Sequence, residues 1–304
     1  MFIEAIEGVW TTNPLQQTRF LLRDPDDITA LKSSAITAVV INTAKGIDPD
    51  APMSDLGGDP LASRADRQKT DVLEARQTVQ QASMLLGNMF ANARVGGAVT
   101  VHETAAIVAD ISRSIDHNPS VFFSVTRLKS KDEITFVHSV SVSALLIHFG
   151  RYLGLDAAIV DLLGMGGLLH DIGKVELPRE ILNKAGGLDE RELKIMRRHP
   201  QLGYDILCKQ QGMPDIVLDI CQHHHERIDG RGYPDQLSDA DFTVPARMAA
   251  ICDVYDAVTS ERPYKRTWSA GEALTWMLKR DGQFDRQLLK KFALCLTTTL
   301  GRPA

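Results

Sequence analysis

The strongest constraint on the fold of this chain is the helical spacing of apolar residues that begins near Arg67 and continues almost to the last residue. Segments such as TDVLEARQTVQQASMLLGNMF and VHETAAIVADISRSI place apolar residues three and four positions apart, which is the repeat of one helix face. Strand signals are nearly absent from this region. Residues 66–304 are therefore predicted to form one all-α domain built as a helical bundle.

The first 65 residues have a different pattern. Thr18–Leu22 and Ile36–Asn42 are short β-prone runs, and Asp24–Asp27 predicts the start of a helix between them. The stretch Ile47–Ala65 contains three prolines and is typical of a linker. We therefore expect residues 1–65 to form a small α+β N-terminal domain with a regulatory or docking role, followed by its linker.

Composition restricts the class of partner and the compartment. The net charge of −5 argues against binding a nucleic-acid polymer, although it leaves room for one anionic small-molecule site. No apolar run approaches the roughly 18 residues that a membrane helix needs, and the N-terminus lacks the pattern of a signal peptide. The four cysteines are widely spaced, without a CxxC pair, which fits a reducing cytoplasm.

Histidines and aspartates recur through the helical region at intervals of 25 to 32 residues, about the length of one helix and its connection. If each set faces inward, all of them converge on one point of the bundle. Imidazoles mixed with carboxylates suit iron, manganese, nickel or zinc, and an adjacent His-Asp pair on a helix can address two neighbouring metals. The set consists of His138, His170, Asp171, His199, His224, His225 and Asp253. We expect His102, His117 and His148 to be ordinary structural histidines. For His223 the sequence does not decide between a metal ligand and a structural residue.

Three cations accompany these residues. Lys174 lies one helical turn after His170, and Arg262 and Lys265 closely follow Asp253. Cations grouped around candidate metal ligands in an otherwise acidic protein indicate that a phosphate group binds there.

The motifs resemble those of one known family. The segments HDIGK (170–174), HHERIDGRGYP (224–234) and DVYDAVTSERPYK (253–265) are similar to the motifs of HD-GYP proteins, whose GYP is here Gly232, Tyr233 and Pro234. The segments 138–146 and 184–207 match the same pattern in order and spacing. Near the N-terminus, Gly8–Trp10 and Ile41–Asp48 resemble the small domain that often precedes HD-GYP domains in bacterial proteins.

The resemblance implies a phosphodiesterase that hydrolyses cyclic di-GMP to pGpG, and in some cases on to GMP, by means of water activated at two metal ions. It makes Asp171 the bridging ligand and Lys174 a second catalytic residue. Lys174, Arg262 and Lys265 would hold the scissile phosphate. Some family members bind a third metal through a Glu four residues before the first histidine. This chain has Ile134 at that position, with Glu133 beside it, so we expect two metals. The implied metal ligands are His138, His170, Asp171, His199, His224, His225 and Asp253.

Several alternatives stay open at this level. The GYP segment is predicted to be an ordered exposed loop that either closes the rim of the bundle, controls substrate access or contacts diguanylate cyclase (GGDEF) domains. The site could instead cleave another cyclic dinucleotide such as cyclic GMP-AMP, or a nucleotide monophosphate. It could also be a non-catalytic sensor that binds cyclic di-GMP. The long helical segment Arg67–Ser114 could pair with a second copy of the chain to form a homodimer.

Overall fold

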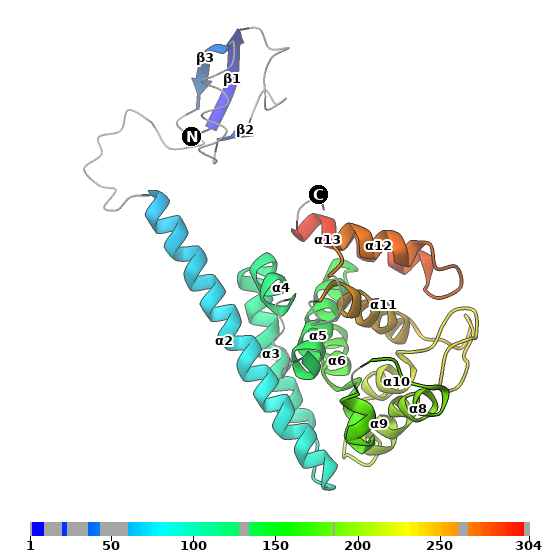
Figure 1. The fold of residues 1–304 in the computed structure, drawn as a ribbon. Coiled ribbons are helices and arrows are strands. Elements are labelled where there is room, and N and C mark those ends of the chain that lie inside the picture. The colour runs from blue at the N-terminus through cyan, green and yellow to red at the C-terminus, as the bar shows by residue number, and fades with distance from the viewer. Residues whose placement is uncertain are drawn as a thin grey trace. The chain divides into compact units, whose positions relative to one another are not determined.

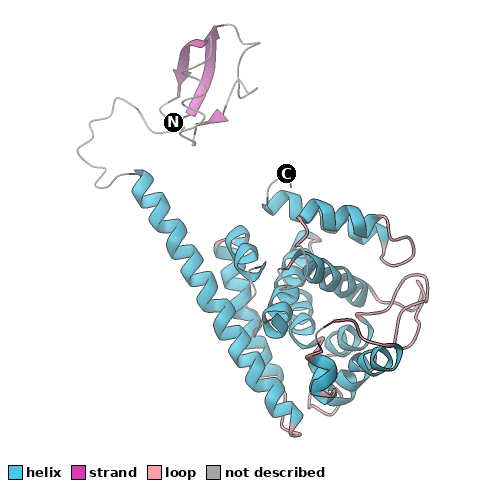
Figure 2. Ribbon diagram, in the orientation of Figure 1, coloured by secondary structure: helices cyan, strands magenta, loops and turns pink. Residues whose placement is uncertain are grey.

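A computed structural model describes residues 2–8, 20–22, 36–42, 60–127, 134–184, 186–260 and 267–300. The chain divides into two compact units, Met1–Ala65 and Asp66–Ala304. The described part of the second unit is helical, and the described strands all belong to the first (Figures 1 and 2). The expectation of a mainly α protein with a small β-containing N-terminal unit is confirmed.

The N-terminal unit contains a three-stranded antiparallel sheet of order β2-β1-β3. Its strands are β1 (Phe2–Gly8), β2 (Phe20–Leu21) and β3 (Ile36–Ile41). The two predicted β-prone runs contain β2 and β3, but the central strand β1 was missed. Its alternation of apolar and polar residues is irregular, and its pairing with β3 shifts register at two places. The predicted helix start at 24–27 lies outside the described residues.

The first described helix is the long α2 (Pro60–Arg94), which begins before the boundary of the second unit at Asp66. The last residues of the predicted linker, 60–65, belong to this helix, so the linker prediction is wrong there. A proline is tolerated in the first helical turn because its missing N–H has no partner to lose. Most buried positions of α2 recur at spacings of four and three, which matches the predicted periodicity, and Phe90 is buried beside one of them: Ala75, Val79, Ala82, Leu86, Met89, Phe90 and Ala93.

The remaining helices follow one another along the chain. They are α3 (Val101–His117), α4 (Pro119–Arg127), α5 (Ile134–Tyr152), α6 (Ala157–Leu169), α7 (Arg179–Leu182), α8 (Glu190–Met196), α9 (His199–Leu207), α10 (Asp215–His223), α11 (Val244–Thr259), α12 (Ala270–Leu278) and α13 (Arg286–Leu300), with the 3-10 helix η2 (Ile172–Glu176) after α6. The sequence did not indicate α4. The apolar spacing of residues 189–210 predicts one continuous helix, but the structure has two, α8 and α9, with a turn at Arg197 and Arg198 before α9 begins at His199.

Helix α5 is the central element of the bundle, with α6 and α11 packed against it (Figure 1). Val140, Val142 and Ala144 on α5 are fully buried. Helix α6 approaches so closely that a Cβ on Gly167 would lie 2.6 Å from the Cα of Ser143. This close packing brings the first half of α5 next to the end of α6, where the chemistry-bearing residues lie.

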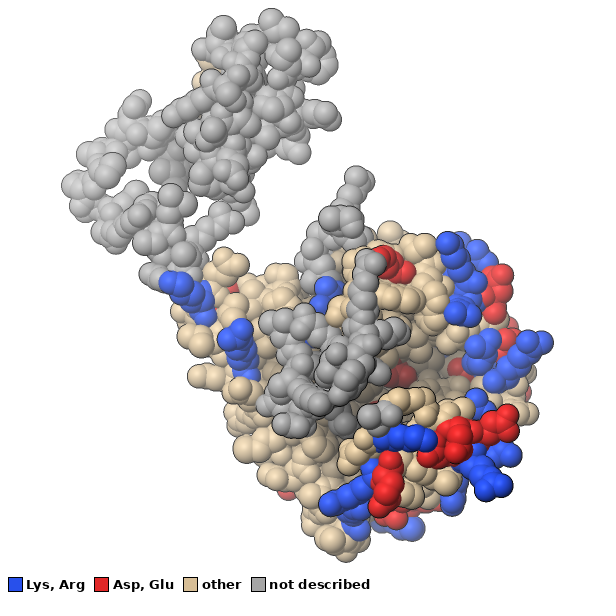
Figure 3. Space-filling model, in the orientation of Figure 1, with Lys and Arg blue, Asp and Glu red and all other residues tan. Residues whose placement is uncertain are grey.

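Charged side chains of both signs intermix on the face shown in Figure 3, where they lie mainly over the region of α8 to α10. This mixture agrees with a modest net charge of −5 and shows no broad basic surface on that face. Among the described residues, no helix has both the length and the apolar character needed to cross a membrane.

Candidate metal centre

The structure brings the seven predicted His and Asp residues together in the interior of the helical unit. Five helix ends or helix faces supply them. His138 lies on α5, His199 begins α9, and Asp253 lies on α11. His170 follows the last residue of α6, and His224 follows the last residue of α10. The remaining two, Asp171 and His225, come directly after those histidines.

The sequence suggested that His170 and Asp171 lie on a helix. In the structure they come after the end of α6 instead. Helix α6 ends at Leu169, and Asp171 precedes the tight turns of η2. The two side chains are therefore oriented by a turn rather than by helical geometry. The buried carboxylate of Asp171 points into the cluster of histidines.

The two oxygens of Asp171 face different histidines. Its Oδ2 lies 3.3 Å from Nε2 of His170, and its Oδ1 lies 3.3 Å from Nε2 of His199 and 4.0 Å from Nε2 of His224. Asp253 spans the cluster in a similar way, with Oδ1 3.0 Å from Nε2 of His138 and Oδ2 3.8 Å from Nδ1 of His225. Each carboxylate thus has one oxygen on each side of the cluster.

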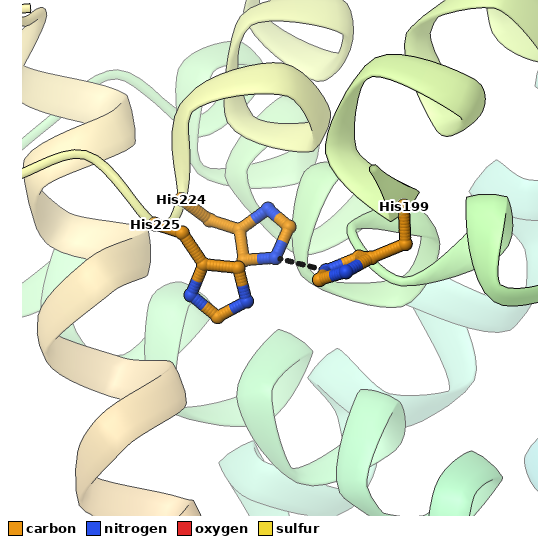
Figure 4. A group of neighbouring side chains, drawn as sticks. All are labelled: His199, His224 and His225. Carbon is orange, nitrogen blue, oxygen red and sulfur yellow. Dashed lines mark hydrogen bonds between the residues drawn. The ribbon is translucent and has the colours of Figure 1, made fainter. Parts of the chain in front are cut away.

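The donor atoms fall into two groups within which all of them lie within 4.8 Å of one another. One group contains His138, His170 and Asp171, and the other contains His199, His224 and His225 (Figure 4). Two imidazoles with a carboxylate, and three imidazoles, are both ligand sets that divalent transition metals accept.

Backbone contacts determine which imidazole nitrogen carries the proton. Nδ1 of His170 lies 2.8 Å from the carbonyl oxygen of Gly167, and Nδ1 of His199 lies 2.8 Å from that of Met196. Nδ1 of His224 lies 3.1 Å from the carbonyl of Ile220. Because a carbonyl only accepts, each Nδ1 must donate, and each neutral ring then presents a bare lone pair at Nε2.

Those lone pairs face other acceptors, which is unfavourable unless a cation lies between them. The Nε2 atoms of His199 and His224 are 3.2 Å apart (Figure 4). Nε2 of His170 is buried without a hydrogen-bond partner among the described residues, although it faces the carboxylate of Asp171. Buried polar atoms without partners cost free energy. The residues present therefore fit divalent metal ions.

Most of the protonation states agree with ligation. Burial lowers the pKa of His199 to about 3 and that of His225 to about 4, and it lowers the pKa of His224 well below its ordinary value. Burial opposes ionisation of Asp171, but Lys174 and the nearby imidazoles outweigh it and hold its pKa well below the usual range. Neutral imidazoles and ionised carboxylates are the forms that bind metals. At His138 burial opposes the charged ring, but hydrogen bonds to Asp253 and Asp256 outweigh burial and raise its pKa to about 9, so a metal ion there would displace a proton.

One residue of this centre, Asp256, was not predicted from the sequence. Its Oδ2 accepts a hydrogen bond from Nδ1 of His138 at 2.6 Å, across 118 residues of sequence. The side chain is buried, and its other oxygen accepts from the hydroxyl of Ser260 at 3.1 Å. A carboxylate behind a ligating imidazole fixes its tautomer and orientation. The only sequence signal was the spacing of Asp253 and Asp256, which places both on the same side of a helix.

The predicted phosphate-binding cations are only partly described. Nζ of Lys174 lies 2.5 Å from Oδ2 of Asp171, three residues before it, so its closest partner is Asp171 rather than His170. Arg262 and Lys265 lie outside the described residues, as does Glu133. Ile134 begins α5 one turn before His138, but its side chain is not described.

The GYP segment packs against the cluster instead of standing free as an exposed loop. Gly232 is buried, and a Cβ there would lie 2.4 Å from the Cα of Glu226. The ring of Tyr233 packs on that of His225, with centroids 4.8 Å apart, and a cis peptide bond joins it to Pro234. The buried carboxylate of Glu226 accepts three backbone N–H groups of residues 235–237 and holds the returning chain in place.

The other histidines lie outside both donor groups. His223 bridges Asp219 and Asp235, at 2.7 and 3.1 Å, and so ties α10 to the chain after the GYP segment. His117 pairs with Asp71 at 3.1 Å, and the ring of His148 packs on Phe123. His102 is exposed on α3.

Comparison with known proteins agrees with this architecture. Residues 114–288 match the HD domain family, and residues 1–104 match a domain of unknown function, DUF3391. The DUF3391 match extends through α2 into α3, well past the first compact unit. The solved structure of Bd1817, an HDG"Y"P protein from Bdellovibrio bacteriovorus, aligns with a TM-score of 0.60 at 17% identity, covering 98% of this chain and 95% of that one. At this identity the likeness concerns the fold alone.

Several curated proteins are related in sequence. The chain is 39% identical to the cyclic di-GMP phosphodiesterase PA4108 of Pseudomonas aeruginosa, over 96% of this chain and 73% of that protein. It is 40% identical to the cyclic di-GMP phosphodiesterase response regulator RpfG of Xanthomonas campestris, and 39% identical to the 3'3'-cGAMP-specific phosphodiesterase 1 of Vibrio cholerae. Those two matches cover 43% and 49% of this chain, but only 35% and 34% of the relatives.

The helical bundle and its internal His-Asp cluster define the class of protein, and the chain belongs to the HD domain family. Within that family it is a phosphodiesterase of the HD-GYP type, with its GYP at Gly232, Tyr233 and Pro234.

Proposed function

We propose that this chain hydrolyses cyclic di-GMP to linear pGpG at two divalent metal ions. The observation that carries this proposal is the buried cluster in which bare imidazole nitrogens face one another and two carboxylates. The relative from Pseudomonas aeruginosa, which aligns with 96% of this chain, bears the name of a cyclic di-GMP phosphodiesterase and supports the choice of substrate.

The two donor groups suggest how the metals are divided. His138 and His170 would hold one ion, and His199, His224 and His225 would hold the other. Asp171 and Asp253 each present one oxygen to either side, so either carboxylate can bridge. Two such ions lower the pKa of bound water and neutralise charge on a phosphodiester. The absence of a Glu at Ile134 supports two metals rather than three.

Lys174 is the described cation best placed to act on the substrate. Its ammonium contacts Asp171 while its side chain stays 29% exposed, so it lies at the boundary between the buried ligands and solvent. A preorganised cation at this position would stabilise the charge that develops on the phosphate. We assign the same role to Arg262 and Lys265, which follow the α11 ligand in sequence.

The test combines metal analysis with product chromatography. The protein is loaded with Mn²⁺ or Fe²⁺, its metal content is measured, and it is incubated separately with cyclic di-GMP and with 3'3'-cGAMP. We expect two metals per chain and conversion of cyclic di-GMP to pGpG. Asp171→Ala should lose both metal and turnover, whereas His102→Ala, which replaces an exposed histidine on α3, should change neither. Cyclic di-GMP that stays intact with the fully loaded protein would refute the proposal.

One specific observation supports a second candidate substrate, 3'3'-cGAMP. The Vibrio cholerae relative named as a 3'3'-cGAMP-specific phosphodiesterase is 39% identical to this chain over 148 residues. Faster turnover of 3'3'-cGAMP than of cyclic di-GMP would assign that specificity instead. Tight binding of cyclic di-GMP without turnover, with several metals loaded in turn, would indicate a sensor.

Three further expectations stay predictions. A diguanylate cyclase domain could dock on the GYP segment, and α2 could pair with a second copy of the chain. The cytoplasm is the expected compartment, and the four free cysteines, three of them buried, are in keeping with it.

A further inference from the structure

A cavity of about 290 Å³ opens beside the metal centre, between the GYP segment and the turn that precedes α13. His224 and His225 form part of its wall, so a ligand in the cavity is continuous with one at the metals. Its size is near the lower end of the range for small-molecule sites. Neither the metal ligands nor the predicted phosphate cations account for the rest of its lining.

Two of the charged side chains in this lining, Arg227 and Glu226, already form hydrogen bonds within the protein. Arg227 makes a bidentate pair with Asp229, with nitrogen–oxygen distances of 2.9 and 2.7 Å. The carboxylate of Glu226 accepts the backbone N–H groups of residues 235–237. These five interactions leave neither group available to a ligand without breaking a native contact.

Two guanidinium groups remain available. Arg197 lies over the ring of Tyr233, 5.5 Å from its centroid, and Arg231, which directly precedes Gly232, is exposed. Within the described part of the chain, neither has a carboxylate at ion-pair distance. Because both line the cavity, it has a net positive rim that would attract an anion.

The remaining wall is suited to a planar apolar group. Phe284, Ala250 and Val254 contribute apolar surface, and the side chain of Gln283 adds an amide that can both donate and accept hydrogen bonds. A ligand that matches this lining joins an anionic group, bound by the arginines, to a flat ring with hydrogen-bonding groups. A nucleotide has this chemistry.

We propose that this cavity binds the half of a cyclic dinucleotide that is not being cleaved. Arg197 and Arg231 contact its phosphate, and its purine base lies against Phe284 and Gln283. This inference rests on the proposed function, since it assigns a subsite to the same substrate. It explains how the site can prefer a dinucleotide over a simple phosphodiester, which needs only the metal centre.

The experiment compares two substrates in Arg197→Ala, Arg231→Ala and the matched control Arg198→Ala. Arg198 is an exposed arginine adjacent to Arg197 that does not line the cavity. With metal-loaded protein, KM and kcat are measured for cyclic di-GMP and for bis(p-nitrophenyl) phosphate, a small diester without a nucleotide. We expect each cavity variant to raise KM for cyclic di-GMP about tenfold to a hundredfold, the range for a lost charged hydrogen bond, with kcat nearly unchanged. Turnover of the small diester should stay unchanged in all three variants.

The outcomes separate the two proposals. Unchanged KM in both cavity variants would refute the subsite, and an equal loss on both substrates would place the arginines in the metal centre instead. If the wild type cleaves only the small diester, cyclic di-GMP is tested as its inhibitor. A weaker inhibition constant in the cavity variants then supports the subsite even though the proposed hydrolysis has failed, and an unchanged constant overturns it.

Discussion

Replacing Gly173 with alanine should disturb the metal centre without touching a ligand. Gly173 lies in η2, where the chain packs against the start of α9. A Cβ at this position would lie 2.0 Å from the carbonyl oxygen of His199 and 2.4 Å from the backbone nitrogen of Gly203. Both neighbouring atoms belong to the backbone, so no side-chain rotation can relieve the clash.

The size of the disturbance follows from these distances. Real Cβ atoms essentially never approach another heavy atom within 3.0 Å, so η2 and α9 must separate by at least about 1 Å. That movement would carry His199 away from Asp171, whose closest oxygen is now 3.3 Å from Nε2. Overpacking of this kind costs about 1–3 kcal/mol of stability, and a misplacement of about 1 Å in a catalytic group can cost about 10²-fold in rate.

Three measurements test this reasoning: the free energy of unfolding in urea, the metal content, and the turnover of cyclic di-GMP. We expect Gly173→Ala to lower all three. The matched control is Gly187→Ala, because a Cβ on Gly187 meets no atom within 4 Å. If Gly173→Ala unfolds at the same urea concentration as the control and keeps its metals and turnover, the close contact between η2 and α9 is not what positions His199.

Asp256→Asn should weaken metal affinity about tenfold in a chelator competition titration, since the carboxylate behind His138 is lost, and Asp256→Ala should weaken it further. Lys174→Ala should lower kcat about 10²–10³-fold with metal content unchanged, and equal loss of metal would contradict a role on the phosphate. Chelator-treated protein should gain about 3 kcal/mol of stability when a metal is restored at 100 times its Kd, seen as a higher Tm. Burial opposes ionisation of Asp285, but hydrogen bonds from α13 and Arg247 outweigh it and lower its pKa. Asp285→Ala should therefore cost about 1 kcal/mol at pH 7 in urea unfolding, a difference that disappears as the pH falls through that lowered pKa.

The sequence predicted those helices that are marked by a local pattern, the regular spacing of apolar residues. Helix α2 was found because its buried residues recur every three or four positions over many turns. By contrast, α4 is short and the break between α8 and α9 follows an uninterrupted helical pattern, so neither stood out. In the N-terminal unit, β1 was missed because its alternation is irregular where its register with β3 shifts.

The candidate ligands could also be named from sequence, because their regular spacing along the chain matches one set per helix. What the spacing could not supply is their orientation. Asp171 faces both donor groups because α6 ends at Leu169 and η2 turns the chain, whereas a continuous helix would have directed it elsewhere. The tautomers of His170 and His199 depend on which backbone carbonyl lies beside each Nδ1.

The sequence by itself therefore determined the helical class, the family and the identity of the seven candidate ligands, since each of these depends on residue type and local spacing. Only the tertiary structure decided how Asp256 supports His138, how Tyr233 covers His225, and where the arginine-rimmed cavity opens. These features join residues that are far apart in the chain or depend on a turn. Their geometry is fixed only when the helices pack, at contacts such as that of Gly173 with α9.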